Sequence, residues 1–220
     1  MKENVRRILS ELPEGVILVA AAKTRTPDEV RRVVEVGVQI IGENYVQEAE
    51  DAFASLGKIA EWHFIGHLQR NKVKKAVSIF DVIETVDSLK LGTRIDRECA
   101  ELGKVMPILV EVNSGREPQK SGVLPEEAEK LVRELAELPH IHVQGLMSMG
   151  PRFGDPELAR PYFQETKRLF DQLSNLPIED TEMHYLSMGM SNTYEIAIEE
   201  GANMVRIGTK IFGERDYEGR

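Results

Sequence analysis

Short apolar runs alternate with amphipathic stretches along the chain. The most apolar run, V-I-L-V-A-A-A-K-T at residues 16–24, is typical of a buried strand that ends at Lys23. Seven further runs predict strands over residues 38–41, 62–65, 80–86, 106–112, 141–147, 182–186 and 203–207. Amphipathic segments between the runs predict helices, and residues 3–12 predict one more helix ahead of the first strand. Strands and helices are therefore expected in regular alternation.

This alternation indicates a closed barrel. Strands separated by helices must run parallel with right-handed crossovers, and eight such units close into a (β/α)8 barrel. A doubly wound open sheet is the alternative, but no G-x-G-x-x-G follows any strand. No linker or domain boundary is visible. We therefore expect a single TIM-type barrel domain over residues 1–220, with an extra N-terminal helix.

Composition narrows the class of protein. The 220 residues include 28 basic and 37 acidic ones, and the formal net charge of −9 argues against a general nucleic-acid or membrane binder. The single cysteine, Cys99, excludes an intrachain disulfide and suits a reducing compartment. The charged amphipathic start is not a signal peptide, and no apolar run approaches the length of a membrane span. We expect a cytoplasmic protein without nucleic-acid or membrane partners.

The first strand places a lysine where barrels bind ligands. Because side chains alternate along a strand, Lys23 shares a face with Val19 and Ala21 at the strand's carboxyl end. That end of a barrel carries the active site in this fold. A lysine held beside small apolar residues can act as a nucleophilic amine. The alternative is that Lys23 only ends the strand and extends its ammonium group into water.

Two loops at the same end offer groups that bind anions. Barrels often hold phosphate after strands seven and eight, and the first of these loops is S-M-G-M-S-N at residues 187–192. Ser191 or Asn192 is the natural N-cap of the following helix, and free N–H groups at a helix start bind anions. An ordinary capped turn would have the same sequence. The second loop adds the backbone and hydroxyl donors of Gly208 and Thr209.

The eighth strand directs an arginine into the barrel. By alternation, Val205 and Ile207 face the helices. Met204 and Arg206 then face the barrel axis. A buried charge needs a partner, which is either a carboxylate such as Glu111 in the fifth strand or a ligand near the mouth.

These features together suit an anionic molecule with a carbonyl group. Pyridoxal 5′-phosphate (PLP) has a phosphate for the two loops, an aldehyde for the lysine and a ring nitrogen for a charged partner. A Schiff-base barrel of the aldolase type, which binds a phosphorylated sugar and no cofactor, would use similar residues. The residue pattern leaves both interpretations open.

Several segments, in this order, closely resemble the pyridoxal-phosphate homeostasis proteins. They are V-A-A-A-K-T, G-E-N-Y-V-Q-E, W-H-F-I-G-H-L-Q-R-N-K, N-S-G-R-E-P-Q-K-S-G, G-L-M-S-M, S-M-G-M-S and V-R-I-G-T-K-I-F-G. That family looks like the isolated N-terminal barrel of alanine racemase. The resemblance therefore implies a PLP barrel of fold type III without the C-terminal β-domain.

The resemblance also implies which residues contact the cofactor. Lys23 matches the lysine that holds PLP covalently as a Schiff base. Arg206 matches the arginine that approaches the pyridine nitrogen, and Asn44 matches the asparagine beside the ring. The residues assigned to the phosphate are Ser187, Ser191, Gly208 and Thr209. His63 and His67 flank the third strand and could line the pocket, although one of them is expected to be structural.

The function implied by the resemblance is reversible covalent binding of PLP and a role in intracellular PLP (vitamin B6) homeostasis, with effects on amino-acid and keto-acid balance. The alternative is a small PLP-dependent amino-acid racemase or decarboxylase. Racemases carry a ring-stacking histidine where this chain has Met149, and a second domain that supplies a tyrosine base. We expect no catalytic residue, no metal site, a monomer, and PLP-dependent apoenzymes as candidate acceptors of the cofactor.

Overall fold

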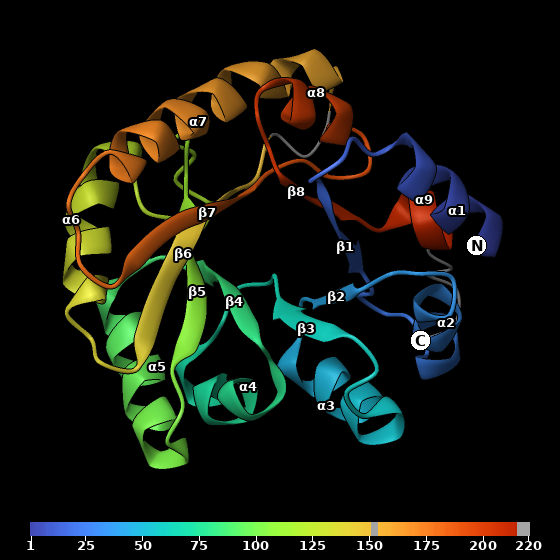
Figure 1. Ribbon diagram of the computed structural model, residues 1–220, viewed down its shortest axis with the longest axis horizontal. Coiled ribbons are helices and arrows are strands. Elements are labelled where there is room, and N and C mark those ends of the chain that lie inside the picture. Colours follow the sequence, from blue (N-terminus) through green and yellow to red (C-terminus); the bar gives the residue numbers. More distant parts are fainter. Residues whose placement is uncertain (151–153, 215–220) are drawn as a thin grey trace.

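Eight parallel strands form a closed barrel. The computed structural model describes residues 1–150 and 154–214 of the chain. Within these residues the strands pair in chain order, and β8 closes the barrel against β1 (Figure 1). The strands are β1 (Ile17–Ala21), β2 (Ile40–Glu43), β3 (Glu61–Phe64), β4 (Val82–Val86), β5 (Met106–Val112), β6 (Ile141–Ser148), β7 (Thr181–Ser187) and β8 (Met204–Ile207).

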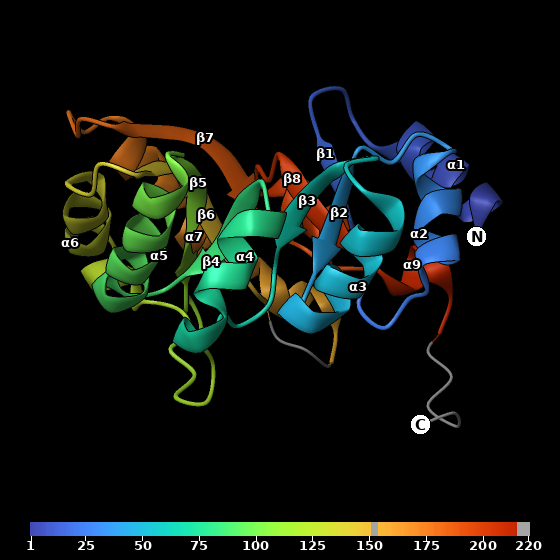
Figure 2. The same ribbon diagram turned by 90° about the horizontal axis from the view of Figure 1, so that it is seen from below.

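Helices surround the barrel and connect successive strands (Figures 1 and 2). The α-helices are α1 (Lys2–Glu11), α2 (Pro27–Val34), α3 (Val46–Leu56), α4 (Val73–Ile79), α5 (Leu89–Leu102), α6 (Pro125–Ala136), α7 (Arg160–Ser174), α8 (Tyr194–Glu199) and α9 (Thr209–Phe212). Two 3₁₀ turns, η1 (Arg70–Lys72) and η2 (Pro156–Ala159), precede α4 and α7. Among the described residues, no helix is both long and apolar enough to cross a membrane.

The predicted (β/α)8 barrel with an additional N-terminal helix is confirmed. Helix α1 lies outside the β/α repeat and packs beside α9 (Figure 1). One polar contact ties the two together, because the Asn4 side-chain amide donates to the carbonyl of Ile211 at 3.3 Å. The first helix therefore covers the segment that follows β8, next to one side of the barrel mouth.

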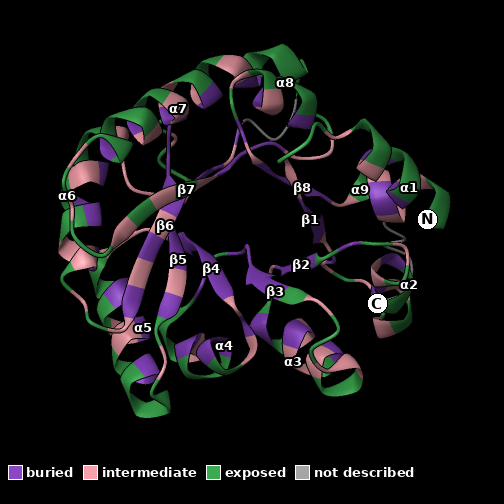
Figure 3. Ribbon diagram, in the orientation of Figure 1, coloured by how far each residue is buried: buried purple, intermediate pink, exposed green. Residues whose placement is uncertain are grey.

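The core has two layers, as the alternation of side chains along each strand requires. Apolar residues on the outer strand faces pack against one face of each helix, so buried positions line the inner side of the ring of helices (Figure 3). A smaller cluster fills the barrel itself. Its buried members are Val19, Ile40, Ile65, Val82, Leu109, Met147 and Met204. Val205 and Ile207 belong to the outer layer, as predicted for β8.

Several helix boundaries follow directly from capping residues. The side chain of Thr26 accepts from the N–H of Glu29, and the Glu29 carboxylate accepts from the N–H of Thr26 in return, which is a capping box. Ser88 is the N-cap of α5, and its hydroxyl accepts from the N–H of Leu91. These local bonds fix where α2 and α5 begin.

Most strand boundaries differ from the sequence prediction by one or two residues, and two differences affect the site. Strand β1 ends at Ala21, so Lys23 lies in the turn after the strand. The sequence analysis assigns no helix or strand after Ile207, but Thr209–Phe212 form the short helix α9. A helix of one turn leaves no repeated hydrophobic pattern in the sequence, so periodicity could not reveal it.

Candidate functional site

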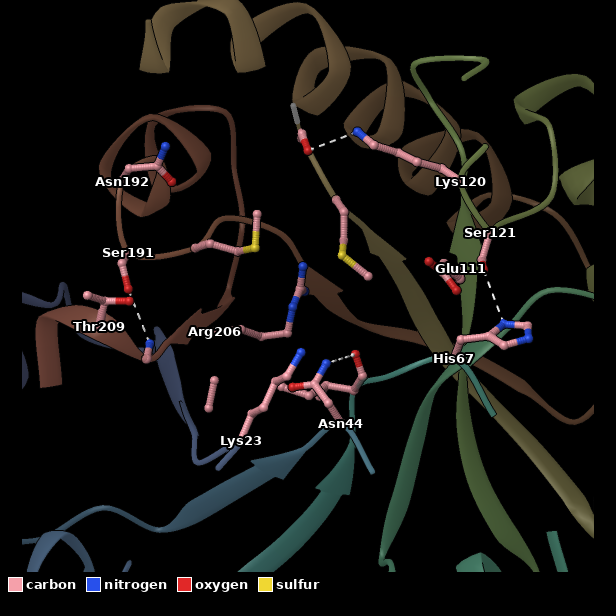
Figure 4. Close-up of a pocket in the computed structure, with 16 residues that line it drawn as sticks. Lys23, Asn44, His67, Glu111, Lys120, Ser121, Ser191, Asn192, Arg206 and Thr209 are labelled. Atoms are coloured by element: carbon pink, nitrogen blue, oxygen red, sulfur yellow. Dashed lines mark hydrogen bonds between the residues drawn. The ribbon is translucent and has the colours of Figure 1, made fainter. Parts of the chain in front are cut away.

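A cavity of about 460 Å³ lies at the carboxyl ends of the strands. Six of the seven predicted cofactor residues line it, and Figure 4 shows how the labelled ones converge. They are Lys23, Asn44, Ser191, Arg206, Gly208 and Thr209. The seventh, Ser187, is fully buried and does not line the cavity. Segments after β1, β2, β7 and β8 thus contribute to one pocket, as the barrel topology requires.

Lys23 reaches this pocket from a tight turn. The N–H of Arg25 donates to the carbonyl of Ala22 at 2.8 Å. Thr24 has a φ of 65°, and its N–H donates to Glu48 Oε2 at 2.8 Å. In the described part of the chain, Lys23 Nζ makes no hydrogen bond or ion pair, and it lies 4.8 Å from the centroid of the Tyr45 ring. The turn therefore holds an amine at the pocket with its hydrogen-bonding capacity unused.

The pocket contains a second lysine, and its surroundings differ. Lys120, from the loop between β5 and α6, forms a very short ion pair with Glu117. It also donates to the carbonyl of Gly150 at 3.3 Å. An ammonium group has no lone pair with which to attack a carbonyl, and an ion pair with a carboxylate favours this protonated form. The contrast favours Lys23 as the reactive amine.

Ser191 joins the loops after β7 and β8. Its hydroxyl oxygen accepts from the N–H of Gly208 at 3.2 Å and from the N–H of Lys210 at 3.4 Å. The prediction that Ser191 or Asn192 caps the following helix was wrong, because Thr193 is the N-cap of α8. The glycine-mediated turn before it directs the hydroxyl across to the neighbouring loop instead. One hydroxyl and two backbone N–H groups therefore meet at the pocket wall.

Two glycines permit close approaches around these donors. A Cβ on Gly208 would lie 3.1 Å from the carbonyl oxygen of Ala21, so this loop packs tightly against the end of β1. A Cβ on Gly66 would lie 2.2 Å from the carbonyl oxygen of Asn44. The Asn44 amide donates to the carbonyl of Ile65 at 3.5 Å and lies beside Lys23 (Figure 4). Close backbone packing thus positions the residues on both sides of the amine.

Arg206 is held from below by a buried network. Its Nη1 donates to Ser187 Oγ at 2.6 Å, and its Nη2 donates to the carbonyl of Ser148 at 2.8 Å. Ser187 Oγ in turn donates to Glu84 Oε2 at 2.6 Å. The sequence analysis suggested Glu111 as the carboxylate partner, but the ion pair is with Glu84, at 3.9 Å. Ser187 therefore contacts the arginine rather than the pocket.

The network continues to a histidine inside the barrel. His63 Nδ1 lies 2.7 Å from Glu84 Oε1, and His63 Nε2 lies 3.3 Å from Glu61 Oε1. Carboxylate oxygens only accept, so both bonds form fully only with the imidazolium. Burial alone would lower the pKa of His63, but hydrogen bonds and charges of Glu61 and Glu84 raise it to about 9. His63 is thus the structural member of the histidine pair, and His67 lines the pocket.

The partners of Glu84 keep that carboxylate ionised. Burial alone would raise the pKa of Glu84, but the hydrogen bond from His63 and the charges of His63 and Arg206 lower it below its usual value. Burial also lowers the pKa of Arg206, opposed by Glu84 and Glu111, and a guanidinium stays charged in proteins. A fixed cation therefore faces the pocket.

Some pocket residues were not assigned by the sequence analysis. Glu111 lines the cavity at 4% exposure, and burial, helped by the charge of Asp87 and opposed by Arg206, raises its pKa to about 7. Ser121 forms a hydrogen bond of 3.1 Å with His67 at the opposite side from Ser191 (Figure 4). The polar loop N-S-G-R-E-P-Q-K-S-G supplies Lys120 and Ser121 to the side of the pocket opposite Ser191. Its composition indicated a polar loop, but its sequence does not fix which side chains turn inward.

The residues present fit an anionic carbonyl compound such as PLP. The pocket offers an amine without a polar partner, a hydroxyl with backbone N–H groups, and a buried guanidinium. These are the groups that an aldehyde, a phosphate and an unprotonated ring nitrogen require. Within residues 1–150 and 154–214, no cluster of three His, Cys, Asp or Glu side chains could hold a metal ion.

Comparison with known sequences gives one consistent family. The family model described as alanine racemase, N-terminal domain, matches residues 1–216. A pyridoxal phosphate homeostasis protein of Aquifex aeolicus is 41% identical over 201 residues, which cover 91% of this chain and 87% of that protein. A protein of the same name from Escherichia coli K12 is 38% identical over 210 residues, which cover 93% of this chain and 88% of that protein.

Solved structures share the barrel. PipY of Synechococcus elongatus PCC7942, in its form with PLP bound, has a TM-score of 0.89 at 32% identity and covers 96% of this chain and 99% of that one. An alanine racemase of Clostridium difficile 630 has a TM-score of 0.79 at 18% identity. It covers 99% of this chain but 56% of the racemase, and at this identity it shows a common fold alone.

Proposed function

The chain belongs to the pyridoxal phosphate homeostasis proteins, whose barrel is that of the alanine racemase N-terminal domain, and on that premise we propose that it binds PLP and acts in PLP homeostasis. The relative PipY, 32% identical, has a structure with PLP bound. PLP is the cofactor that the donor set of the pocket suits. Pyridoxal phosphate homeostasis is the role given in the names of the relatives.

The observation that carries the proposal is the contrast between the pocket's two lysines. Lys120 is paired with Glu117, whereas Lys23 has no hydrogen bond or ion pair among the described residues. We assign the covalent Schiff base to Lys23. The cofactor supplies an aldehyde, and its condensation with the lysine amine releases one water molecule. Because this reaction is reversible, a bound cofactor can be given up to another amine.

The other pocket residues divide between the two ends of the cofactor. Ser191, Gly208 and Thr209 would hold the phosphate, since their hydroxyl and N–H groups lie together at one wall. Arg206 would face the ring nitrogen and Asn44 the ring. Ser187 acts one step removed, by orienting Arg206. A guanidinium next to the ring nitrogen disfavours its protonation, which weakens the ring as an electron acceptor.

The bound cofactor would serve as a store of PLP. Reversible attachment to Lys23 would buffer free PLP and deliver it to PLP-dependent apoenzymes. Changes in amino-acid and keto-acid balance would follow from the supply of PLP to those enzymes. We propose a monomer as the working form, in which one barrel supplies all the residues assigned to the cofactor.

A racemase needs two acid–base groups on opposite faces of the substrate carbon. Lys23 could be the first, and the described part of the pocket offers no tyrosine for the second. Tyr217 lies outside the described residues. Met149 lines it where racemases carry a ring-stacking histidine. A missing acid–base partner costs typically about 10²–10⁴-fold. Against an ordinary turnover of about 10 s⁻¹, we expect alanine racemisation on the order of 0.1 s⁻¹ or slower.

Two assays test the function. The purified protein incubated with PLP should absorb visible light and, after borohydride reduction, gain the mass of one reduced PLP. An aldolase-type barrel would show neither change. Deuterium incorporation at the α-carbon of alanine, with chiral analysis of the product, separates binding from racemisation: inversion at ordinary enzyme rates would make the racemase interpretation the better one.

A further inference from the structure

A continuous line of polar side chains crosses the barrel interior beneath the pocket. It runs from Arg206 through Ser187, Glu84 and His63 to Glu61, with successive hydrogen bonds of 2.6, 2.6, 2.7 and 3.3 Å. Barrel interiors are usually filled with branched apolar residues, and most of the remaining interior of this barrel is apolar, with the buried carboxylate of Glu111 at the pocket as an exception. Buried charges are costly unless they are paired. We therefore expect this line of polar side chains to have a function beyond filling the barrel.

We propose that His63 and Glu84 are positioning residues for Arg206, and that protonation of His63 from the far end of the barrel controls how tightly the pocket holds its anionic cofactor. The inference rests on the proposed function, because Arg206 is the residue that would face the cofactor ring. It adds residues that do not touch the cofactor, and it adds a dependence of binding on pH.

The coupling passes through the two oxygens of Glu84. One oxygen accepts from His63 and the other accepts from Ser187, which also accepts from Arg206. With His63 protonated, the charge of Glu84 is shared between two cations. When His63 loses its proton, the whole of that charge acts on Arg206, whose Nη1 lies 3.9 Å away. The guanidinium is then drawn toward the interior, and the region beneath the pocket loses one positive charge.

The groups that face His63 account for its proton. Glu61 on its own strand and Glu84 on β4 are its hydrogen-bonding partners. Across the barrel, Tyr185 on β7 packs against the interior cluster, and burial followed by the charge of Glu61 raises its pKa. Arg206 on β8 and Glu111 on β5 complete the charged and titratable groups of the described interior, and Glu111, whose pKa burial raises to about 7, acts on Arg206 from the pocket side. The carboxylates of Glu61 and Glu84 contact His63 directly, whereas the Arg206 guanidinium does not, so the protonated form of His63 is favoured.

The far end of the line is open to solvent. Glu61 begins β3, at the amino end of the strand, and its side chain is 48% exposed. It lines a surface cavity of about 520 Å³ together with Lys58 and Asp81. His63 itself is 1% exposed. Protons therefore reach His63 from the end of the barrel opposite the pocket, where bound cofactor does not block them.

The test uses a probe that cannot form a Schiff base. Pyridoxine 5′-phosphate has the phosphate and ring of PLP but no aldehyde, so its affinity reports the pocket alone. Affinity is measured by calorimetry between about pH 7 and 10 for the wild type, Glu61→Gln, His63→Gln and Glu182→Gln. Glu182 is the matched control, an exposed carboxylate on β7 without a hydrogen bond to His63. Ionisation of the probe is common to all four proteins and cancels in their comparison.

We expect the wild type and Glu182→Gln to lose about tenfold in affinity, beyond the change shared by all proteins, as pH rises past 9. In Glu61→Gln this loss should occur at a lower pH, because one partner of the imidazolium is gone. In His63→Gln it should be absent. Nitrogen-15 NMR of the imidazole, which follows its proton directly, should show the same shift of midpoint in Glu61→Gln.

Two outcomes overturn the inference. If the affinity of Glu61→Gln depends on pH in the same way as that of the wild type, the line of polar side chains does not control cofactor affinity. If NMR shows His63 neutral at pH 7, the proposed charge on the line is wrong. Glu61→Gln is an exposed substitution, so the test does not depend on a core variant that fails to fold. Absence of any PLP adduct on the wild-type protein would instead refute the proposed function, and the two failures are distinguishable.

Discussion

Polar side chains at the rim of the pocket make fewer hydrogen bonds to the protein than those in the barrel interior beneath it. At the rim, Lys23 has no hydrogen bond or ion pair among the described residues, and Ser191 only bridges two backbone N–H groups. In the interior, Arg206, Glu84 and His63 each make two hydrogen bonds to protein groups. The rim therefore has capacity left for a ligand. In the interior, Glu84 and His63 bond to protein groups through both of their polar atoms, and Arg206 keeps further guanidinium N–H groups for a ligand.

This difference separates binding from folding. Removing a rim group takes away a contact with the ligand and leaves the folded protein without a new unpaired charge. Removing an interior group leaves its partners buried and uncompensated, which destabilises the fold. Substitutions at the rim should thus change ligand binding, and substitutions in the interior should change the free energy of unfolding.

The largest effect on cofactor binding is expected at the rim, for Lys23→Ala. Loss of the covalent bond should weaken retention of PLP by about two powers of ten or more, with little change in thermal stability. Lys120→Ala is the matched control, since it removes another pocket lysine and should keep the adduct. Retention is measured by visible absorbance after dialysis. Equal retention of PLP by Lys23→Ala and the wild type would show that Lys23 does not hold the cofactor covalently.

In the interior, Glu84→Ala should mainly affect folding. It leaves Arg206 and His63 without their shared carboxylate, and breaking a buried pair costs about 3–5 kcal/mol. The exposed pair of Glu134 with Lys130 offers a control, because Glu134→Ala should change the free energy of unfolding by about 0.5 kcal/mol or less. Denaturant titration of both variants measures this. A loss as small as that of the control would show that the network is not essential to the fold.

The charge of His63 predicts a pH dependence of stability. Its pKa is raised from 6.5 to about 9 in the folded protein, so its stabilising contribution is complete below pH 6.5 and is lost as pH rises through 9. The size of this contribution is on the order of 3 kcal/mol. The difference in unfolding free energy between the wild type and His63→Gln should therefore shrink across this range. A constant difference would mean that His63 is neutral in the folded state.

The smallest effect is expected for Ser191→Ala at the rim. A hydrogen bond to a charged group contributes about 1.5–3 kcal/mol, so affinity for PLP should fall by about one to two powers of ten. Pyridoxal, which lacks the phosphate, should bind the variant and the wild type alike. Ser121→Ala, on the other side of the pocket, is the matched control. An equal loss for pyridoxal would show that Ser191 does not act through the phosphate.

Much of this architecture could be predicted from the sequence, because it depends on local patterns. Alternation along β8 correctly placed Val205 and Ile207 outside and Arg206 inside. The number and order of strands followed from apolar runs. Lys23 was expected at a strand end, and it lies two residues beyond one, still at the pocket.

The partners of these residues could not be predicted in the same way. Which carboxylate meets Arg206 depends on the stagger of strands around the closed barrel, and that stagger brings Glu84 rather than Glu111 into contact. Ser191 was expected to cap its own helix, but Gly189, with a φ of 87°, turns the loop toward β8. Periodicity indicates which face a side chain occupies, and long-range register determines what it contacts.

The central claim is that an unpartnered rim lysine, and not any other lysine of the pocket, holds PLP. The most direct measurement is proteolysis of the borohydride-reduced protein followed by tandem mass spectrometry, which locates the modified residue. We expect the reduced cofactor on Lys23 alone. A label on Lys120 or Lys210, with Lys23 unmodified, would contradict the assignment and the contrast between rim and interior on which it rests.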